Sequence, residues 1–427
     1  MEKTKIGYAK NIITPPLGTQ LAGHAIMDRK AEGIHDELYC RVIILDNNGE
    51  EFCIIQNDLV GLGYDFVDET KVNLKELGLK EENIFIGCTH THSGPKGLTK
   101  NVKGRPEDIE MMSGHYNETL CQNIQQAIIT TVKEALANKT PGVLNYGISE
   151  VNGVSSNRND RNNPGDQILL ALEFILDNGK KILAYNYSCH PTVVNHRNHF
   201  ITADFPHGVA KLIEDTEYEL VMFINGSSGD ISTRFTRREA SFEEIDRLGL
   251  ILKNKIDEAL ETTTTSDLEN IKVKDKTFKI ALKRIGTVEE IQAKLDNYQK
   301  ELDLAIQESK PNIRTYESFV EGARINLFLA QSGQEGEYLD IKYKLLKIDD
   351  LIFVFVPSEL FYELVKPLKE ESNGKLFFCT HFNGSMGYIA DQGSYDRDTY
   401  ETQTSRFLAG QGEVFREEVK KEVEAFK

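Results

Sequence analysis

The chain has 427 residues, of which 40% are hydrophobic and 27% are charged, as in an ordinary soluble globular protein. This length allows one large domain or two ordinary ones, with a core large enough to fold without disulfides. The formal net charge is −17, from 67 acidic and 50 basic side chains, and no basic cluster stands out. The charge excludes nucleic acid as an expected partner and disfavours binding to an anionic membrane surface.

The N-terminus, MEKTKIGYAKNIITPP, lacks an apolar stretch of signal-peptide length, and no later segment approaches the apolar length of a transmembrane helix. The six cysteines contain no CxxC motif, and four of them lie in or beside apolar runs. This pattern favours reduced, packed thiols over a disulfide framework. We therefore expect a cytoplasmic protein without stable membrane insertion. The sequence makes no prediction of the oligomeric state.

Strands and helices alternate in the first third of the chain. After a short strand and a Pro-Pro turn at 5–17, two apolar segments joined by an Asn-Asn-Gly turn predict a β-hairpin. A further apolar, β-branched run lies between two amphipathic patterns. We predict strands at about 38–45, 52–59 and 84–88, and helices at 65–77 and 107–137. The alternation favours an α/β core.

The middle third continues this pattern. A long polar loop, VNGVSSNRNDRNNPGD, carries Arg158, and loops of this length are often functional. Two apolar strands joined by an Asp-Asn-Gly turn follow, and the second ends at His190, while Asp204 is placed to cap the next helix. Three more histidines lie in this loop and helix start: His196, His199 and His207. We predict further strands at 142–150 and 220–224, and a helix at 242–260.

The last third begins with a charged region at 262–335, whose patterning predicts a helical insertion or lid. Strands return at 338–356 and in LFFCTHF, and a charged C-terminal helix is expected to be solvated. No internal repeat or low-complexity linker divides the chain. We predict an α/β fold of mixed β-sheets flanked by helices, with residues 1–427 forming a single large catalytic domain.

Several predicted strands end in polar, turn-rich segments, and strand ends are where α/β sheets build their sites. The strand at 84–88 runs into Thr-His-Thr-His-Ser-Gly-Pro. His90 and His92 can share one face there, because alternate residues of an extended segment point the same way. Imidazole is the commonest metal ligand near neutral pH. The alternative is a pair of hydrogen-bonded turn histidines.

Other candidate residues also follow apolar strands. His190 and Glu359 would suit a hydrolytic zinc site, which needs three or four such donors and room for water; the alternatives are a turn histidine and an acidic helix start. Ser232 is a candidate nucleophile or a loop residue, and its surroundings do not match the G-x-S-x-G elbow. Arg158 could bind a carboxylate or oxyanion, or be a surface arginine. Tyr388 could be an acid, an oxyanion donor or a ligand, or simply pack.

Six motifs occur in order across most of the chain: THTHSGP at 89–95, SSNR at 155–158, CHPT at 189–192, SGDIS at 228–232, VPSE at 356–359 and GYI at 387–389, whose tail runs through Glu401. Together they resemble the catalytic domain of the neutral/alkaline non-lysosomal ceramidase family. GIHDELYCRVIIL near the N-terminus is similar to the family's opening hairpin. The chain departs from the family pattern at Thr233-Arg234 and in the Leu-Phe that follows Glu359.

The resemblance implies a zinc enzyme that cleaves the amide bond of an N-acyl sphingoid base. It implies one Zn²⁺ per chain, with the ligands His90, His190, Glu359 and Tyr388. His92 would stand beside the metal as a hydrogen-bonding or proton-handling group, and Arg158 would orient the substrate or stabilise the oxyanion. Ser232 falls on the serine proposed as nucleophile in the family.

Two routes are then open: attack by a water molecule activated by zinc, or attack by Ser232 with an acyl intermediate. We favour the first, because zinc lowers the pKa of water to about 7 and polarises the carbonyl; Ser232 would position substrate or water. We expect a zinc-dependent amidohydrolase acting on a small-molecule or lipid N-acyl substrate, with ceramide as the leading candidate by resemblance. The alternatives are a hydrolase of the same architecture for a small soluble amide or ester, and a catalytically inactive homologue that binds lipid or metal.

Overall fold

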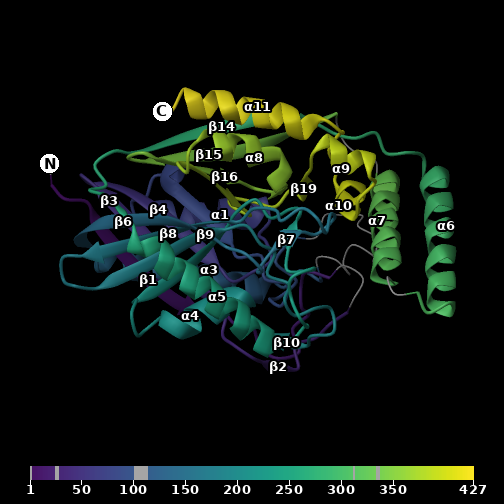
Figure 1. Cartoon of the computed structure of the whole chain (residues 1–427), viewed down its shortest axis with the longest axis horizontal. Coiled ribbons are helices and arrows are strands. Elements are labelled where there is room, and N and C mark those ends of the chain that lie inside the picture. The colour runs from purple at the N-terminus through teal and green to yellow at the C-terminus, as the bar shows by residue number, and fades with distance from the viewer. Residues whose placement is uncertain (1, 25–27, 101–113, 311–312, 333–336) are drawn as a thin grey trace.

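The structure is a computed structural model that describes residues 2–24, 28–100, 114–310, 313–332 and 337–427. Its elements form four layers, in the order helices, small sheet, large sheet, helices, and Figure 1 shows them stacked from top to bottom. The mixed sheets with flanking helices confirm the fold class predicted from the sequence. No helix among the described residues has the length and apolarity to span a membrane.

The large sheet has nine strands in the order β11-β9-β8-β6-β1-β3-β4-β5, with β13 beside β6. The pairs β4–β5 and β9–β11 are parallel and the others antiparallel. The sheet curls, so that β11 also contacts β1 and β4. The strands are β1 (Lys5–Ile12), β3 (Tyr39–Asn47), β4 (Glu50–Asn57), β5 (Ile84–Cys88), β6 (Thr140–Glu150), β8 (Ile168–Leu176), β9 (Lys181–Tyr187), β11 (Leu220–Asn225) and β13 (Thr264–Ser266).

Both faces of the large sheet are buried, because side chains alternate between two cores. In β3, Val42 and Ile44 face a helix layer, whereas Ile43 and Leu45 face the small sheet. One half of the sheet is covered by α1 (Tyr64–Lys75) and α3 (Glu118–Ala137), and the other by α4 (Phe205–Ile213) and α5 (Phe242–Glu261). Burial on both faces explains why these strands are nearly continuous apolar runs.

The small sheet has the order β14-β15-β16-β18 and lies between the large sheet and two helices. Its strands are β14 (Ile271–Ala281), β15 (Tyr338–Ile348), β16 (Leu351–Val356) and β18 (Leu376–Thr380). The covering helices are α8 (Tyr362–Glu371) and α11 (Gln411–Glu424). The C-terminal helix α11 is therefore not wholly solvated: Phe415, Val419 and Val423 are buried against this sheet.

Three two-residue ladders lie outside the sheets and hold the loops at the strand ends. They are the parallel pair β2 (Gly33–Ile34) and β10 (Phe200–Ile201), the antiparallel pair β7 (Ser156–Asn157) and β12 (Ile231–Ser232), and the parallel pair β17 (Glu359–Leu360) and β19 (Tyr388–Ile389). The remaining short elements are η1 (Glu81–Asn83), α9 (Gln392–Asp396) and α10 (Tyr400–Thr404).

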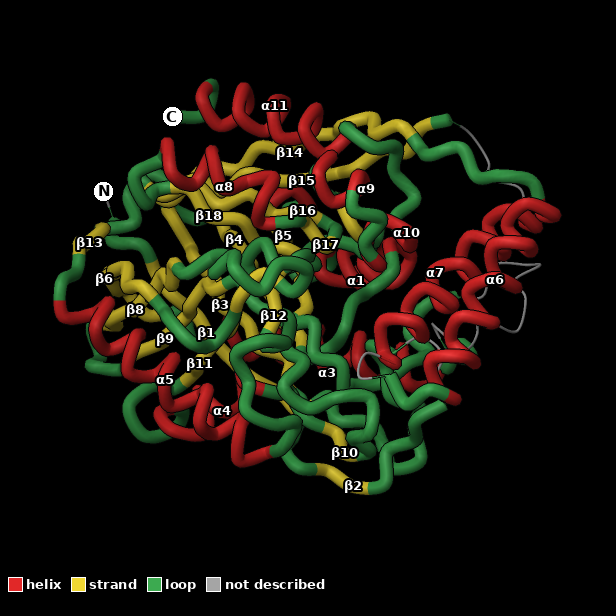
Figure 2. The backbone as a smooth tube through the Cα atoms, turned by 45° about the vertical axis from the view of Figure 1, so that its right-hand side comes forward, coloured by secondary structure: helices red, strands yellow, loops and turns green. Residues whose placement is uncertain are grey.

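The helical insertion predicted at 262–335 is partly wrong. Among the described residues of this range, only α6 (Val288–Gln307) and α7 (Ile313–Ser332) are helical, and they form the hairpin at the right of Figures 1 and 2. Residues 264–266 and 271–281 are the strands β13 and β14. The β14 strand lies at an edge of the small sheet, so its many lysines can face solvent, and this charge hid the strand pattern.

The helix predicted at 107–137 begins later, at Glu118, and residues 107–113 lie outside the described residues. Asn117 is the N-cap, since its side chain accepts a hydrogen bond from the Leu120 backbone N–H. Asp204 is the N-cap of α4, as the sequence predicted, and its side chain accepts a hydrogen bond from the Phe205 backbone N–H. All six cysteines are buried and unpaired, which also agrees with the prediction.

Helices α4 and α5 approach each other closely at two glycines. A Cβ atom on Gly249 would lie 2.3 Å from the carbonyl carbon of Gly208, so no side chain fits without moving the helix backbones. We expect Gly249→Val to lower the free energy of unfolding by about 1–3 kcal/mol, measured by urea denaturation. Leu250→Ala, at a half-exposed position next in α5, should change it by no more than about 0.5 kcal/mol. Equal stability of the two variants would contradict this packing.

Candidate metal centre

The histidine-bearing strand ends meet because the large sheet curls, and Asn225 ties them together. This fully buried residue ends β11; its Nδ2 donates to the Thr89 carbonyl at 3.2 Å, and its Oδ1 accepts from the Cys189 backbone N–H at 3.4 Å. The loops after β5 and β9 are thereby held side by side. His90 has φ 72°, a backbone conformation uncommon outside glycine that is found at functional sites.

The loop after β16 brings a third residue, Glu359, to the two histidines. Glu359 pairs with Tyr388 in the β17–β19 ladder, and the Gly229 N–H donates to the carbonyl of Leu360 at 2.9 Å. The His190 backbone N–H donates to the Ile231 carbonyl at 3.0 Å, which fixes the end of β9 to the segment after β11 that carries Gly229. Residues separated by almost 270 positions in the sequence thus converge on one point, as the strand-end motifs predicted.

Three donor atoms lie at nearly equal separations in this centre. His90 Nε2 is 3.2 Å from His190 Nε2 and 3.4 Å from Glu359 Oε2, and the last two atoms are 3.1 Å apart. Ligand atoms about 2.0–2.1 Å from a tetrahedral zinc ion are about 3.3 Å apart, so the three donors have the spacing of one face of such a site. His92 Nε2 is 3.3 Å from His90 Nε2, and the three imidazoles form a candidate metal-binding group.

The hydrogen bonds behind the rings explain why their Nε2 atoms face one another. His90 Nδ1 lies 2.5 Å from the Val60 carbonyl oxygen, and His190 Nδ1 lies 2.6 Å from that of Ser228. A carbonyl can only accept, so each Nδ1 carries a proton, and in the neutral form of either ring the Nε2 lone pair points into the centre. Two lone pairs and a carboxylate facing one another repel unless a cation lies between them. The donor set therefore fits a metal ion.

The pKa shifts favour the same ligand forms. Burial lowers the pKa of His190 to about 4, and the charge of Arg158 acts in the same direction. Burial would raise the pKa of Glu359, but the neighbouring His90 and His190 outweigh it and hold this pKa well below its ordinary value. A neutral His190 and an ionised Glu359 at neutral pH are the forms that bind metals.

Two further histidines surround the centre and were not singled out as site residues from the sequence. His381, directly after β18, stacks on His90 with a ring separation of 3.8 Å, and His24 packs edge-on against His92 at 5.3 Å. Burial lowers the pKa of His381 and of His92 well below the ordinary value. His381 ends an apolar strand as His90 and His190 do, so the same signal was present in LFFCTHF.

A cleft of about 390 Å³ opens onto the centre. His90, His92, Glu359 and Tyr388 lie on its inner wall. Apolar residues form part of the remaining lining: Val60, Leu62, Pro95, Leu98 and Ile325. The Tyr388 side chain is partly exposed there. Burial of its phenol raises the pKa well above the ordinary value, and the negative charge of Glu359 acts in the same direction. The cleft combines an apolar wall with a polar base, as small-molecule sites do.

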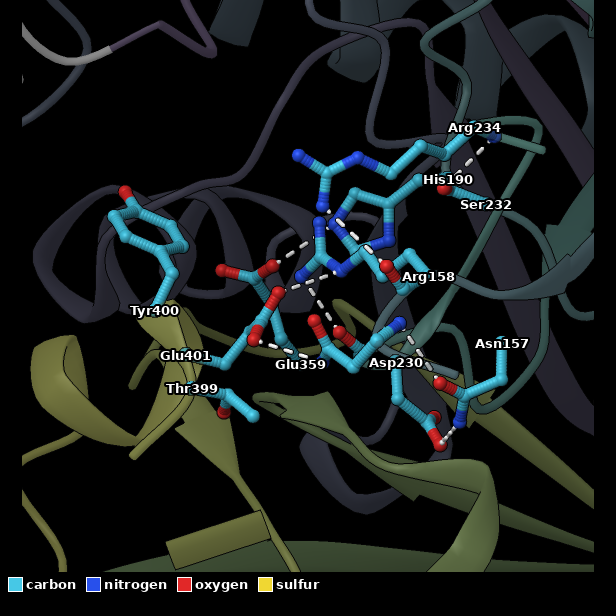
Figure 3. Close-up of polar contacts among 12 residues, drawn as sticks. Asn157, Arg158, His190, Asp230, Ser232, Arg234, Glu359, Thr399, Tyr400 and Glu401 are labelled. Atoms are coloured by element: carbon cyan, nitrogen blue, oxygen red, sulfur yellow. Dashed lines mark hydrogen bonds and ion pairs between the residues drawn. The ribbon is translucent and has the colours of Figure 1, made fainter. Parts of the chain in front are cut away.

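Arg158 lies behind the centre in a buried ion pair (Figure 3). Its Nε is 2.8 Å from Glu401 Oε1, its Nη2 donates to the Gly229 carbonyl at 2.6 Å, and its guanidinium carbon is 5.5 Å from the centroid of the Tyr388 ring. Burial alone would lower the pKa of Arg158, but the charge of Glu401 outweighs this and raises it. The guanidinium is thus a fixed positive charge close to both Tyr388 and His190.

Ser232 is buried in β12, and a parallel bridge places it beside His190. Its Oγ accepts a hydrogen bond from the Arg234 backbone N–H at 3.2 Å, which Figure 3 shows. Within the described part of the chain, no imidazole or carboxylate is hydrogen-bonded to this hydroxyl. Asp230 fixes the same loop, since its carboxylate accepts from the Tyr362 backbone N–H at 2.6 Å and from Asn157 Nδ2 at 2.9 Å.

Fold and centre together define a layered α/β protein with a buried histidine–carboxylate centre able to hold a metal. Residues 5–235 match the family model described as neutral/alkaline non-lysosomal ceramidase, N-terminal. This match covers more than half of the chain, and the chain belongs to this family.

Individual relatives agree with the family assignment. The neutral ceramidase of Drosophila melanogaster is 26% identical over 236 residues, which is 50% of this chain and 32% of that protein. The neutral ceramidase of Pseudomonas aeruginosa is 25% identical over 202 residues, covering 43% of this chain and 29% of that protein. The aligned region thus spans about a third of the length of these relatives.

The solved structures show the same fold. The crystal structure of neutral ceramidase from Pseudomonas aeruginosa superimposes with a TM-score of 0.75 at 18% sequence identity, over 97% of this chain and 73% of that chain. A ceramidase complexed with C2 matches with a TM-score of 0.74 and 16% identity, over 97% of this chain and 74% of that chain.

Proposed function

We propose that this protein is a zinc-dependent amidohydrolase that cleaves the amide bond of an N-acyl compound, with an N-acyl sphingoid base as the leading substrate. The observation that carries the proposal is the set of three donors, on His90, His190 and Glu359, spaced 3.1–3.4 Å apart. Two of them, His90 and Glu359, line the cleft. Membership of the ceramidase family and the names of the relatives support the substrate class.

In this proposal one catalytic zinc ion would be held by His90, His190 and Glu359, with Tyr388 as the fourth protein ligand. When bound, zinc would polarise the amide carbonyl and activate a water molecule. The two imidazoles are oriented for this role by the hydrogen bonds from their Nδ1 atoms to the Val60 and Ser228 carbonyls. His92, beside His90 and facing the cleft, accepts or donates the proton that moves during amide cleavage.

Arg158 acts on the substrate carbonyl oxygen in this proposal. Its position is set by Glu401 and the Gly229 carbonyl, so its charge does not need to reorganise as the oxyanion develops. The apolar wall of the cleft, formed in part by Val60 and Leu62, would bind the acyl chain and exclude water from the reacting bond.

Ser232 positions substrate or water rather than attacking the carbonyl, because its hydroxyl has no hydrogen-bonded base among the described residues. We expect Ser232→Ala to lower kcat/KM by less than about 100-fold, whereas loss of a true nucleophile costs on the order of 10⁶. Ser227→Ala in the same loop, where the hydroxyl is buried and makes no hydrogen bond in the structure, is the matched control. A loss near 10⁶, together with a burst of released amine in the wild type, would instead assign attack to Ser232.

The size of the cleft supports a second candidate substrate class. Its volume of about 390 Å³ is near the lower end for small-molecule sites, which suits a compact N-acyl compound or a short-chain ceramide. A panel of N-acyl sphingosines of increasing chain length, N-acyl amino acids and small esters separates the two. Highest kcat/KM on N-acyl sphingosines supports the leading proposal, and highest kcat/KM on the soluble amides or esters supports the second. An absence of turnover on every member would favour a catalytically inactive binding protein.

A further inference from the structure

A second group of potential metal ligands lies apart from the catalytic cleft. His35, Asp36 and His207 each offer one ligand atom, and all three atoms lie within 4.8 Å of one another. None of them lines the cleft that opens onto His90 and Glu359. The family resemblance and the proposed reaction leave these residues without a role.

Two neighbouring strands bring these residues together. The two-residue strands β2 and β10 run parallel and lie side by side at the lower edge of Figure 2. His35 and Asp36 follow β2 directly, and His207 lies in the first turn of α4, a few residues after β10. Backbone N–H groups at His35 and at Asp36 both point at the Ile201 carbonyl, at 2.9 and 3.4 Å, so the two strand ends are fixed together.

The Asp36 carboxylate lies between the two imidazoles, with one oxygen facing each ring. Asp36 Oδ2 is 2.7 Å from His35 Nδ1, and its Oδ1 is 3.7 Å from His207 Nδ1. Ligand atoms of a tetrahedral zinc site are about 3.3 Å apart, so a bound ion would draw His207 closer to Asp36 and hold His35 slightly farther from it. The two imidazoles are partly exposed, with 23% and 26% of their side-chain surfaces accessible, so solvent can complete the coordination.

The charge balance also favours a cation. The Asp36 side chain is only 2% exposed, and within the described residues its sole ion-pair partners are the two imidazoles. The nearby guanidinium of Arg41 is taken by Asp58 and Glu214. On α4, Lys211 is paired with Asp246 of α5. A carboxylate removed from water needs a positive partner, and a metal ion bound by both imidazoles would supply it.

We propose that His35, Asp36 and His207 form a second binding site for a divalent transition-metal ion, with Zn²⁺ as the expected occupant. Two imidazoles and one carboxylate suit zinc and its neighbours rather than Mg²⁺ or Ca²⁺, which prefer sites built of oxygen ligands. The site is separate from the proposed catalytic centre, because the two share no ligand residue.

The second ion would act as a structural clip. It would join the segment after β2 to the segment after β10, and residues on both sides of β10 support the loop that carries His90 and His92. The Thr202 carbonyl accepts from Thr91 Oγ1 at 2.7 Å, and Asn198 Nδ2 donates to Ser93 Oγ at 3.0 Å. An ion at the second site would therefore hold the catalytic loop through a short chain of contacts.

Zinc content per chain, measured by plasma mass spectrometry after equilibration with Zn²⁺ and gel filtration, tests the site in a background that lacks the first centre. We expect two equivalents in the wild type, one in His190→Ala, and none in His190→Ala combined with either His35→Gln or His207→Gln. His199→Gln, at a more exposed histidine of the same segment, is the matched control and should keep its zinc.

Thermal unfolding provides a second measurement of zinc binding, which still distinguishes the variants if one of them is less stable than the wild type. Added Zn²⁺ should raise the Tm of His190→Ala and leave the Tm of His190→Ala/His207→Gln unchanged. Co²⁺ bound to His190→Ala should give a visible absorption band that the double variant lacks. Zinc-free His190→Ala, or zinc in it that survives both glutamine substitutions, would overturn the proposal and leave a hydrogen-bonded His–Asp–His cluster. If instead the His90, His190 and Glu359 centre does not bind zinc, the result would differ, because His190→Ala would keep the full zinc content of the wild type.

Discussion

His190→Ala is expected to lose one equivalent of zinc per chain relative to the wild type and to lose more than about 100-fold in kcat/KM on N-acyl substrates. His190 is completely buried, its Nδ1–H is fixed on the Ser228 carbonyl, and its Nε2 lies 3.2 Å from His90 Nε2 and 3.1 Å from Glu359 Oε2. Substitutions in the outer shell of a metal site already cost about 10–100-fold, so removal of a direct ligand should exceed this range.

The control separates loss of the ligand from loss of the fold. Removal of a buried ring leaves a cavity, so His190→Gln, which keeps more of the volume, should be measured beside the alanine variant. His199→Ala removes a partly exposed imidazole from the same loop and should retain both zinc and activity. Full zinc content or unchanged turnover in a folded His190→Ala protein would remove this residue from the ligand set.

Arg158→Ala is expected to lower the free energy of unfolding by about 3–5 kcal/mol, because it leaves the Glu401 carboxylate buried without its positive partner. Glu401 is 2% exposed, and the ion pair to Arg158 Nε measures 2.8 Å. Urea denaturation measures the loss. Lys375→Ala, which breaks a pair with Asp350 in which both side chains are more than half exposed, should cost no more than about 1 kcal/mol.

The double variant Arg158→Ala/Glu401→Gln shows whether the unpaired charge is the cause. With the carboxylate neutralised, it should be more stable than Arg158→Ala alone, although the cavity remains. The double variant should still show reduced turnover, since the charge proposed to act on the substrate oxyanion is missing. Equal instability of the single and double variants would assign the effect to lost packing instead.

Much of the fold could be predicted because the local signals agree with the tertiary structure. Asn-Asn-Gly and Asp-Asn-Gly turns between apolar runs predicted the β3–β4 and β8–β9 hairpins, and the run at 84–88 matches β5. β14 was missed, since a strand at a sheet edge keeps its charged side chains in solvent and lacks an apolar run. The sheet order depends on contacts between distant segments and could not be predicted from local patterns.

The individual candidate ligands of the metal centre could be predicted from the sequence. His90, His190 and Glu359 each follow an apolar strand, and the structure brings their donor atoms within 3.4 Å of one another. Their assignment as ligands stays a prediction. The role of Asn225 depends on the curl of the large sheet, which no local pattern encodes.

The second group of ligands was hidden for a related reason. His35 and Asp36 lie in GIHD, a stretch that the sequence linked only with an opening hairpin. Strands of two residues, such as β2 and β10, give no periodicity, so their pairing and the approach of His207 appear only in three dimensions.

The most direct test of the account is the release of free fatty acid from a short-chain N-acyl sphingosine by the purified wild-type protein, before and after removal of its metal by a chelator. The account predicts that the protein hydrolyses the amide and that turnover is lost when the metal is removed. Turnover should recover when added Zn²⁺ refills the catalytic centre with about one equivalent. Hydrolysis that continues undiminished in fully metal-free protein would contradict the central claim that the His90, His190 and Glu359 centre acts through zinc.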